Sequence, residues 1–213
     1  MKTLFKLIST YLVLSILAII AGGVILGLTT KIGGHLAVNA THTPFQDIAF
    51  LWITHIGDGI FVIVGTVVLT LLYWKRYGIS ILLLSLINLA IVGGLVAFFK
   101  HLVFADAFRP IKFIGRENLY IVPDAPINLA NSFPSGHTTA AFAFFALVAF
   151  LFPTNRIAQA LCVVIAVLVG YSRIYLSQHF LEDVVAGAVL GIICFILSYF
   201  IVRALPLKNN LTR

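Results

Sequence analysis

Three short polar segments of this chain hold residue types that can transfer a phosphoryl group. The first runs from Lys100 to Pro110, the second is Phe133-Pro134-Ser135-Gly136-His137, and the third runs from Ser172 to Asp183. Each lies at the end of a long apolar stretch. Ionisable residues at such positions are costly to place in a membrane, and they are therefore candidates for a functional site.

The third segment pairs a histidine with a carboxylate. Asp183 follows His179 by four residues, and residues four apart share one face of a helix. A carboxylate that holds one imidazole nitrogen fixes the tautomer and leaves the other nitrogen free to attack. Arg173 adds a planar guanidinium suited to bidentate binding of phosphate. The alternative for this segment alone is a structural His–Asp pair beside an interfacial arginine.

The second segment predicts an anion site at the start of a helix. Pro134 and Ser135 precede a long apolar run, and Ser135 is placed to cap the helix that this run predicts. A helix N-terminus offers unpaired N–H groups and the positive end of the helix dipole, which together favour a phosphate. His137 would lie in the first turn beside it. An ordinary capped helix with an interfacial histidine is the alternative.

Taken together, the segments supply two histidines, a carboxylate, two arginines, a lysine and a helix N-terminus. This set fits phosphoryl transfer, with one histidine attacking phosphorus, the other protonating the leaving oxygen, and the cations stabilising the phosphoryl oxygens. We expect no metal and no other cofactor. No acidic cluster suggests Mg²⁺, and Cys162 and Cys194 lie inside apolar runs without the spacing of metal ligands.

The elements that must position these residues are membrane-spanning helices. Hydrophobic residues make up 61% of the 213 residues and charged residues only 10%, whereas a soluble domain has roughly 25% charged residues. A span needs about 20 apolar residues. The apolar segments cover about residues 7–29, 48–74, 78–101, 136–153, 157–177 and 182–204. We therefore expect an all-α polytopic membrane protein, one domain over residues 1–213 with six transmembrane helices, the first an uncleaved span.

Charged residues predict the orientation of the chain. With both termini in the cytoplasm, eight cations lie inside: Lys2, Lys6, Lys75, Arg76, Arg156, Arg203, Lys208 and Arg213. Six lie outside, and three of these, Lys100, Arg109 and Arg173, belong to the candidate site. The remaining bias of eight to three follows the positive-inside rule. We expect a bacterial-type plasma (inner) membrane with the site facing the exterior. The dispersed cations predict no nucleic-acid partner, and no obligate protein partner is expected.

The three segments resemble a known set of motifs. Arg109-Pro110, Pro134-Ser135-Gly136-His137, and Ser172-Arg173 followed by His179 and Asp183 are similar to the signature motifs of the type 2 phosphatidic acid phosphatase superfamily. Lipid phosphate phosphatases, undecaprenyl-diphosphate phosphatases and vanadium haloperoxidases share these motifs. The motifs lie within residues 100–183, and the resemblance implies a helical-bundle core like that of the superfamily.

The resemblance also implies a role for each matching residue. His179 would be the nucleophile and form a phosphohistidine, and Asp183 would orient it. His137 would be the general acid and later the base that activates water. The phosphate would be held by Arg109, Ser135, the Gly136 amide and Arg173.

The first motif departs from the superfamily pattern. Leu102 stands seven residues before Arg109, where the superfamily has a lysine, and Lys100 stands nine before it. On a straight helix, seven residues turn through about 700° and end on the same face, whereas nine turn through about 900° and end on the opposite face. We expect Lys100 to bind phosphate if the helix breaks before Arg109. Asp106-Ala107-Phe108 is the candidate break, and Lys112 is a less favoured substitute.

Two further segments carry polar residues that these roles leave unassigned. Thr54 to Gly59 contains His55 and Asp58, three residues apart, which would either serve helix packing and pairing or contact substrate. Glu117 to Ala130 forms a loop with two prolines and mixed charge, which would cover the site or touch a lipid headgroup.

The sequence therefore predicts a membrane-embedded phosphatase that hydrolyses a phosphomonoester or diphosphate of a lipid at the outer leaflet. Undecaprenyl diphosphate, phosphatidylglycerol phosphate, phosphatidic acid and lipid A are the candidate substrates. One alternative is a lipid phosphotransferase that passes phosphate to lipid A. The other is an ion channel or transporter, which would spread polar residues through the membrane depth, whereas here they gather at one end of the helices.

Overall fold

The protein folds into a bundle of helices. The computed structural model describes residues 2–206 and residue 211, and every regular element among them is a helix, as predicted. The α-helices are α1 Lys2–Leu7, α2 Ser9–Leu28, α3 Lys31–Asn39, α4 Pro44–Ile53, α5 Gly59–Tyr77, α6 Ile79–Phe98, α7 Pro110–Ile114, α8 Gly136–Leu151, α9 Arg156–Tyr175 and α10 Leu181–Ala204. The short elements are the 3₁₀ helices η1 Thr54–Gly57 and η3 Arg116–Asn118 and the π-helical turn η2 Phe99–Val103.

Five helices of the described chain are long and apolar enough to cross a membrane, namely α2, α5, α6 with its extension through η2, α9 and α10. This confirms a protein with several membrane spans. The sixth expected span corresponds to α8, which is apolar but has only 16 residues. At 1.5 Å per residue it is about 24 Å long, less than the roughly 30 Å of a hydrocarbon core. Twelve of its residues are buried, so α8 is the central helix of the bundle.

The predicted bounds of the second span, 48–74, are wrong, because the structure divides these residues into α4, η1 and α5, and only α5 is a span. Asp58 has an extended backbone (φ −70°, ψ 146°), and its side chain accepts a hydrogen bond from the Ile60 N–H at 3.0 Å. A carboxylate in this position caps the start of a new helix. The chain therefore turns at Asp58, and residues 54–57 become a separate short element beside the bundle.

The packing of α8 against α10 depends on glycines. A Cβ added to Gly187 would lie 2.7 Å from the Ser135 backbone oxygen, and one added to Gly191 would lie 2.5 Å from the Thr139 backbone oxygen. Lipid tails are as apolar as leucine, so helices in a membrane associate mainly through close packing, which small residues allow. These two glycines bring the backbone of α10 against the first turns of α8.

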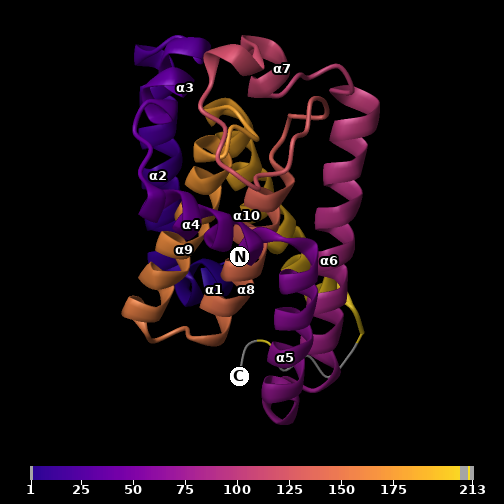
Figure 1. The fold of residues 1–213 in the computed structure, drawn as a ribbon. Coiled ribbons are helices and arrows are strands. Elements are labelled where there is room, and N and C mark those ends of the chain that lie inside the picture. The colour runs from indigo at the N-terminus through magenta and orange to yellow at the C-terminus, as the bar shows by residue number, and fades with distance from the viewer. Residues whose placement is uncertain (1, 207–210, 212–213) are drawn as a thin grey trace.

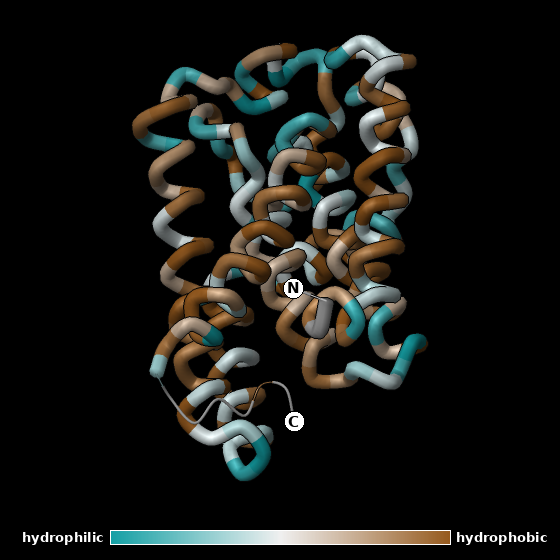
Figure 2. The backbone as a smooth tube through the Cα atoms, turned by 180° about the vertical axis from the view of Figure 1, so that it is seen from behind, coloured by the Kyte–Doolittle hydropathy of each residue, from teal (hydrophilic) through white to brown (hydrophobic). Residues whose placement is uncertain are grey.

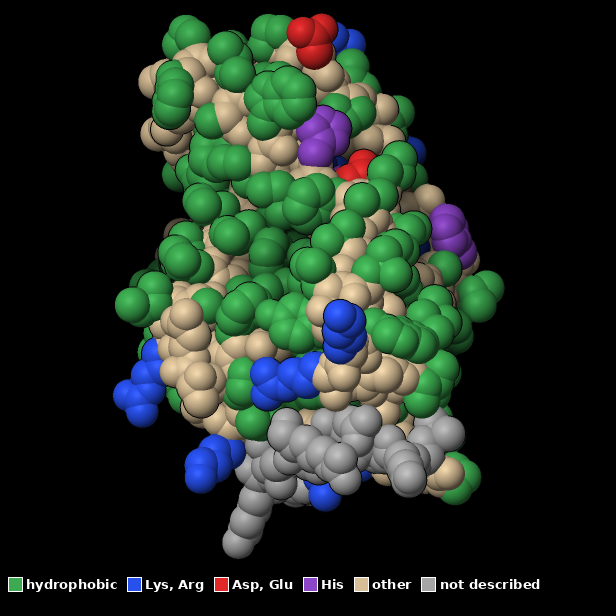
Figure 3. Space-filling view, turned by 90° about the horizontal axis from the view of Figure 1, so that it is seen from below, with side chains coloured by type: hydrophobic (Ala, Val, Ile, Leu, Met, Phe, Trp, Pro, Cys, Tyr) green, Lys and Arg blue, Asp and Glu red, His purple; other side chains and the backbone are tan. Residues whose placement is uncertain are grey.

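The two ends of the bundle differ in composition. In Figure 1, α3 and α7 lie at the top, whereas the α5–α6 turn and the α8–α9 turn lie at the bottom. Figure 2 shows hydrophobic residues along most of the helices and hydrophilic residues mainly in the connections. In the view from below, most of the visible Lys and Arg side chains lie in the lower half of the picture, and the visible Asp and Glu side chains lie in the upper half (Figure 3). Lys75 and Arg76 end α5 and Arg156 begins α9, so basic residues lie at both of the lower turns of Figure 1.

We predict that Gly191→Ala destabilises the bundle. The added methyl group meets backbone atoms of α8 that cannot move aside, and overpacking of this kind costs about 1–3 kcal/mol. The melting temperature in detergent should fall by roughly 3–10 °C. Gly93→Ala is the matched control, because a Cβ at Gly93 has no neighbour within 4 Å. Equal melting temperatures for the two variants would contradict the role given to the α8–α10 contact.

Candidate active site

The three predicted segments meet at one place, around the loop between α9 and α10. The Ser135 N–H donates to the Asp183 backbone oxygen at 3.0 Å, which joins the second segment to the third. Arg109 Nη1 donates to the Gln178 backbone oxygen at 3.0 Å, which joins the first to the third. Within the third segment, the N–H groups of Gln178 and His179 both donate to the Arg173 backbone oxygen. Backbone contacts therefore fix the segments before any ligand is bound.

The His179 side chain is oriented by Asp183. His179 Nδ1 lies 3.2 Å from Asp183 Oδ2, and the Phe180 N–H donates to the same oxygen at 2.9 Å. Burial holds the pKa of His179 well below its ordinary value, and Arg109, Arg173 and Lys100 add to this effect. The imidazole is therefore neutral near pH 7. With its proton on Nδ1, facing the carboxylate, the lone pair on Nε2 is free to act as a nucleophile.

Ser132 contacts both members of this pair, and no pattern in the sequence predicted its role. Its hydroxyl donates to Asp183 Oδ2 at 2.5 Å, and its oxygen lies 3.4 Å from His179 Nδ1. The side chain is 1% exposed. A serine at this point in a loop has no helical spacing to Asp183, so only the fold reveals the contact.

Arg109 and Arg173 both lie close enough to His179 to act on it electrostatically. Arg109 Nη1 lies 3.4 Å from His179 Nε2, and Arg109 Nε donates to the Ala130 backbone oxygen. Arg173 Nη1 donates to Thr54 Oγ1 at 2.7 Å, whereas Arg173 Nε is buried without a hydrogen-bond partner in the described chain. A buried charged donor without an acceptor is unfavourable. Its position favours an anion as the missing partner.

Lys100 reaches the site because α6 ends in the π-helical turn η2 and the chain leaves the helix at Phe104. The wider turn shifts the face on which Lys100 lies, and its Nζ is 3.9 Å from the position that a Cβ on Gly136 would occupy. Leu102, at the position of the superfamily lysine, is 76% exposed. Lys112 instead lies over the Phe108 ring, 3.9 Å from its centroid. The helix therefore breaks before Arg109, earlier than the predicted break at Asp106.

His137 and Ser135 occupy the start of α8, where the sequence placed them. Ser135 is the N-cap, and its hydroxyl oxygen accepts from the Thr138 N–H at 3.4 Å. Arg173, His179, Lys100 and Arg109 are all close enough to His137 to act on it electrostatically. His137 therefore lies within electrostatic range of four other residues of the predicted site.

The Thr54 to Gly59 segment contacts residues of the site. Thr54 binds Arg173, and a Cβ on Gly57 would lie 2.8 Å from the His137 backbone oxygen. Asp58 caps α5, and His55 contacts the Trp52 ring at a centroid distance of 6.2 Å. The Asp58 N–H donates to the His55 backbone oxygen at 3.0 Å, and no hydrogen bond joins the two side chains in the described structure. The segment therefore serves packing and support of Arg173.

Within residues 2–206 and 211, no three His, Cys, Asp or Glu residues lie close enough together to hold a metal ion. The cations that act electrostatically on His179 are Arg109, Arg173 and Lys100.

Comparison with known proteins agrees with this arrangement. A family model described as the PAP2 superfamily matches residues 78–206, which include all three segments. The chain belongs to the PAP2 superfamily. It is 37% identical over 83 residues to a lipid A 1-phosphatase of Rhizobium johnstonii, an alignment that covers 39% of this chain and 33% of that protein. It is 34% identical over 102 residues to the undecaprenyl-diphosphatase BcrC of Bacillus subtilis, which covers 48% of this chain and 49% of BcrC.

A solved structure resembles this chain over almost its whole length. The first transmembrane PAP2-type phosphatidylglycerolphosphate phosphatase from Bacillus subtilis superposes on 98% of this chain and 100% of its own with a TM-score of 0.64. The sequences are 23% identical, so this match shows the shared fold. The two curated relatives are matched over only about a third and a half of their lengths.

We predict that Ser132→Ala lowers turnover without unfolding the protein. Loss of the hydroxyl removes one of three donors to Asp183 Oδ2 and loosens the orientation of His179, so kcat should fall by about tenfold while KM changes little. The change should be measured with a water-soluble phosphate ester. Ser80→Ala is the matched control, because Ser80 is fully buried on α6 and has no hydrogen-bond partner in the described chain. A similar kcat in both variants would contradict the positioning role.

Proposed function

We propose that this protein hydrolyses a phosphomonoester or diphosphate of a membrane lipid through a phosphohistidine on His179. The observation that carries the proposal is the state of that side chain. It is buried, its Nδ1 lies 3.2 Å from Asp183 Oδ2, and its Nε2 lies 3.4 Å from Arg109 Nη1. Burial and the nearby cations Arg109, Arg173 and Lys100 hold the pKa of the imidazole well below its ordinary value. A neutral imidazole beside an arginine cluster suits attack on a dianionic phosphate, because the cations offset the charge that would otherwise repel it.

In the first step, His179 Nε2 attacks phosphorus and the bond from phosphorus to the leaving oxygen breaks. His137 gives its proton to that oxygen. In the second step, His137 takes a proton from water, the water oxygen bonds to phosphorus, and the bond from phosphorus to Nε2 breaks. Inorganic phosphate leaves and both histidines return to their starting states. Arg109, Arg173 and Lys100 hold the phosphoryl oxygens throughout, with Ser135 and the Gly136 amide at the start of α8.

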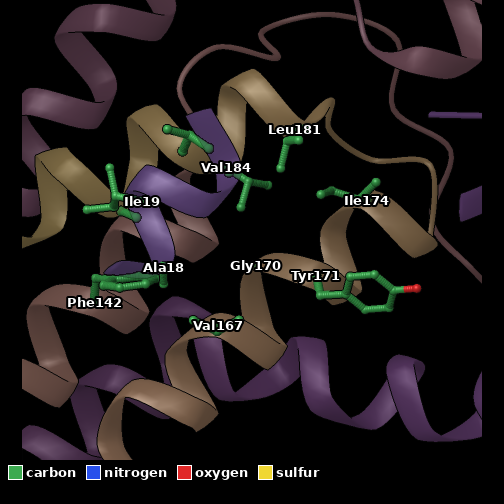
Figure 4. A pocket seen from close by; sticks show the side chains of 12 residues that line it. Ala18, Ile19, Phe142, Val167, Gly170, Tyr171, Ile174, Leu181 and Val184 are labelled. Carbon is green, nitrogen blue, oxygen red and sulfur yellow. The ribbon is translucent and has the colours of Figure 1, made fainter. Parts of the chain in front are cut away.

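A lipid substrate is supported by apolar space next to the site. Side chains from α2, α9 and α10 line a cavity of about 130 Å³ (Figure 4). Tyr171, Ile174 and Leu181 line this cavity and also a neighbouring one of about 140 Å³, which reaches Phe180, the residue after the nucleophile. A hydrocarbon chain fits such space, whereas a soluble sugar phosphate has no use for it. The names of the relatives support lipid A, undecaprenyl diphosphate and phosphatidylglycerol phosphate as candidates, with phosphatidic acid beside them.

The proposed setting is the bacterial-type inner membrane, with both termini in the cytoplasm and the site at the outer leaflet. Lys75 and Arg76 end α5, and Arg203 lies in the last turn of α10. All three belong to the end of the bundle opposite α3 and α7. The positive-inside rule supports this end as the cytoplasmic one.

A phosphate-release panel tests the proposed reaction. Purified protein should release inorganic phosphate from at least one of undecaprenyl diphosphate, phosphatidylglycerol phosphate, phosphatidic acid and lipid A, and EDTA should not inhibit it. His179→Ala should lower the rate by at least about 10³-fold, and His137→Ala by about 10²–10⁴-fold, because they remove the nucleophile and the general acid.

His101→Ala is the control, because His101 is exposed in η2 and has no role in these steps. Full activity in a folded His179→Ala protein would contradict the phosphohistidine. Transfer of labelled phosphate to a second lipid without release of free phosphate would favour a phosphotransferase instead.

A further inference from the structure

Gln178 stands directly before the nucleophile and is fully buried. Its side-chain oxygen accepts from Arg109 Nη1 at 3.3 Å and from Asn128 Nδ2 at 2.9 Å. Its side-chain nitrogen donates to the backbone oxygens of Pro126 at 2.5 Å and Leu176 at 3.3 Å. Both ends of the amide are therefore used, and one of its partners is an arginine of the site.

The loop between η3 and α8 receives two of these bonds. We call residues 119–131 the strap. Its first part is held by Asn39, whose side chain exchanges hydrogen bonds with the backbone of Tyr120, and by Asp47, which accepts from the Tyr120 hydroxyl at 2.8 Å. Its middle part is held by Gln178 at Pro126 and Asn128. The strap is therefore anchored to three separate elements.

The last part of the strap in turn holds Arg109. The Arg109 N–H donates to the Leu129 backbone oxygen at 3.0 Å, and Arg109 Nε donates to the Ala130 backbone oxygen at 2.9 Å. Arg109 Nη1 donates to both the backbone and the side-chain oxygen of Gln178. Gln178 thus holds the guanidinium directly through Nη1 and indirectly through the strap. In the described structure no hydrogen bond ends on Arg109 Nη2, which leaves this nitrogen to bind an anion.

We propose that Gln178 is a positioning residue that fixes Arg109 beside Nε2 of His179, both by its own contact and by anchoring the strap. The guanidinium is planar, so contacts at Nε and Nη1 fix the direction in which Nη2 points. The site then meets a phosphate with its donors already aligned, which lowers the entropy lost on binding. The identity of the lipid rests on the proposed function, whereas the effect on anion binding does not.

Orthovanadate is the probe, because it resembles five-coordinate phosphorus and needs no knowledge of the lipid. Gln178→Met keeps the length of the side chain and removes all four hydrogen bonds, so the affinity for orthovanadate and kcat/KM should both fall by about tenfold or more. Gln159→Met is the matched control. Gln159 is also a buried glutamine that donates to backbone oxygens, at Leu7 and Phe152, but it lies far from the site. Its variant should lose thermal stability and keep its affinity for orthovanadate.

A double-mutant cycle separates positioning from a merely structural role. If Gln178 acts through Arg109, then Gln178→Met should change the affinity by less than about twofold in an Arg109→Ala background. Equal losses in both backgrounds, or a Gln178→Met protein that melts lower but binds orthovanadate normally, would overturn the proposal. If Gln178→Met does not fold, Asn128→Ala removes one strap contact from outside the core, and it should weaken binding about threefold in the same Arg109-dependent way.

Failure of the proposal for Gln178 can be distinguished from failure of the proposed function. A wild-type protein that releases no phosphate from any lipid would refute the phosphatase, while the coupling of Gln178 to Arg109 in orthovanadate binding would still stand. An active phosphatase without that coupling would refute only the role of Gln178.

Discussion

The close contact between α8 and α10 is the constraint on which the site depends. Gly187 allows the backbone of α10 to lie against Ser135, and the Ser135 N–H then donates to the Asp183 backbone oxygen. This contact places the histidine of the second segment next to the His–Asp pair of the third, although the two are more than forty residues apart in the chain. Because the helices lie in lipid, close packing at small residues drives their association, whereas hydrophobic burial drives it in water.

Around this contact, the protein gathers cations with little opposing charge. Arg109 and Arg173 are largely buried, and their bonds to protein go to neutral oxygens of Ala130, Gln178 and Thr54. Neutral acceptors hold a guanidinium in place without cancelling its charge, which leaves the charge for an incoming phosphate. The carboxylate of Asp183 lies on the Nδ1 side of His179, and Arg109 lies on the Nε2 side. In the proposed reaction, this arrangement separates the group that orients His179 from a group that binds the anion.

Much of this arrangement could be predicted from residue types and spacing. The contact of His179 with Asp183 and the capping role of Ser135 were predicted, although His179 lies in the loop before α10 and not on a helix. Five of the six expected spans are long apolar helices. The π-helical turn that brings Lys100 into the site could not be predicted, because hydropathy does not distinguish it from ordinary helix. The contacts of Ser132 and Gln178 could not be predicted either, since their partners come from distant segments. The division of residues 48–74 into separate helices was not predicted, because one capping residue, Asp58, has little effect on the hydropathy of a long apolar run.

The most direct test is a crystal structure of the protein with orthovanadate. The account predicts vanadium bound to His179 Nε2, with its oxygens within hydrogen-bond distance of Arg109 Nη2, Arg173 Nε and Lys100 Nζ, and with His137 next to the oxygen opposite Nε2. Vanadate bound at another place, or bound with Arg173 Nε still unpaired, would contradict the claim that these side chains form one site around the phosphoryl group.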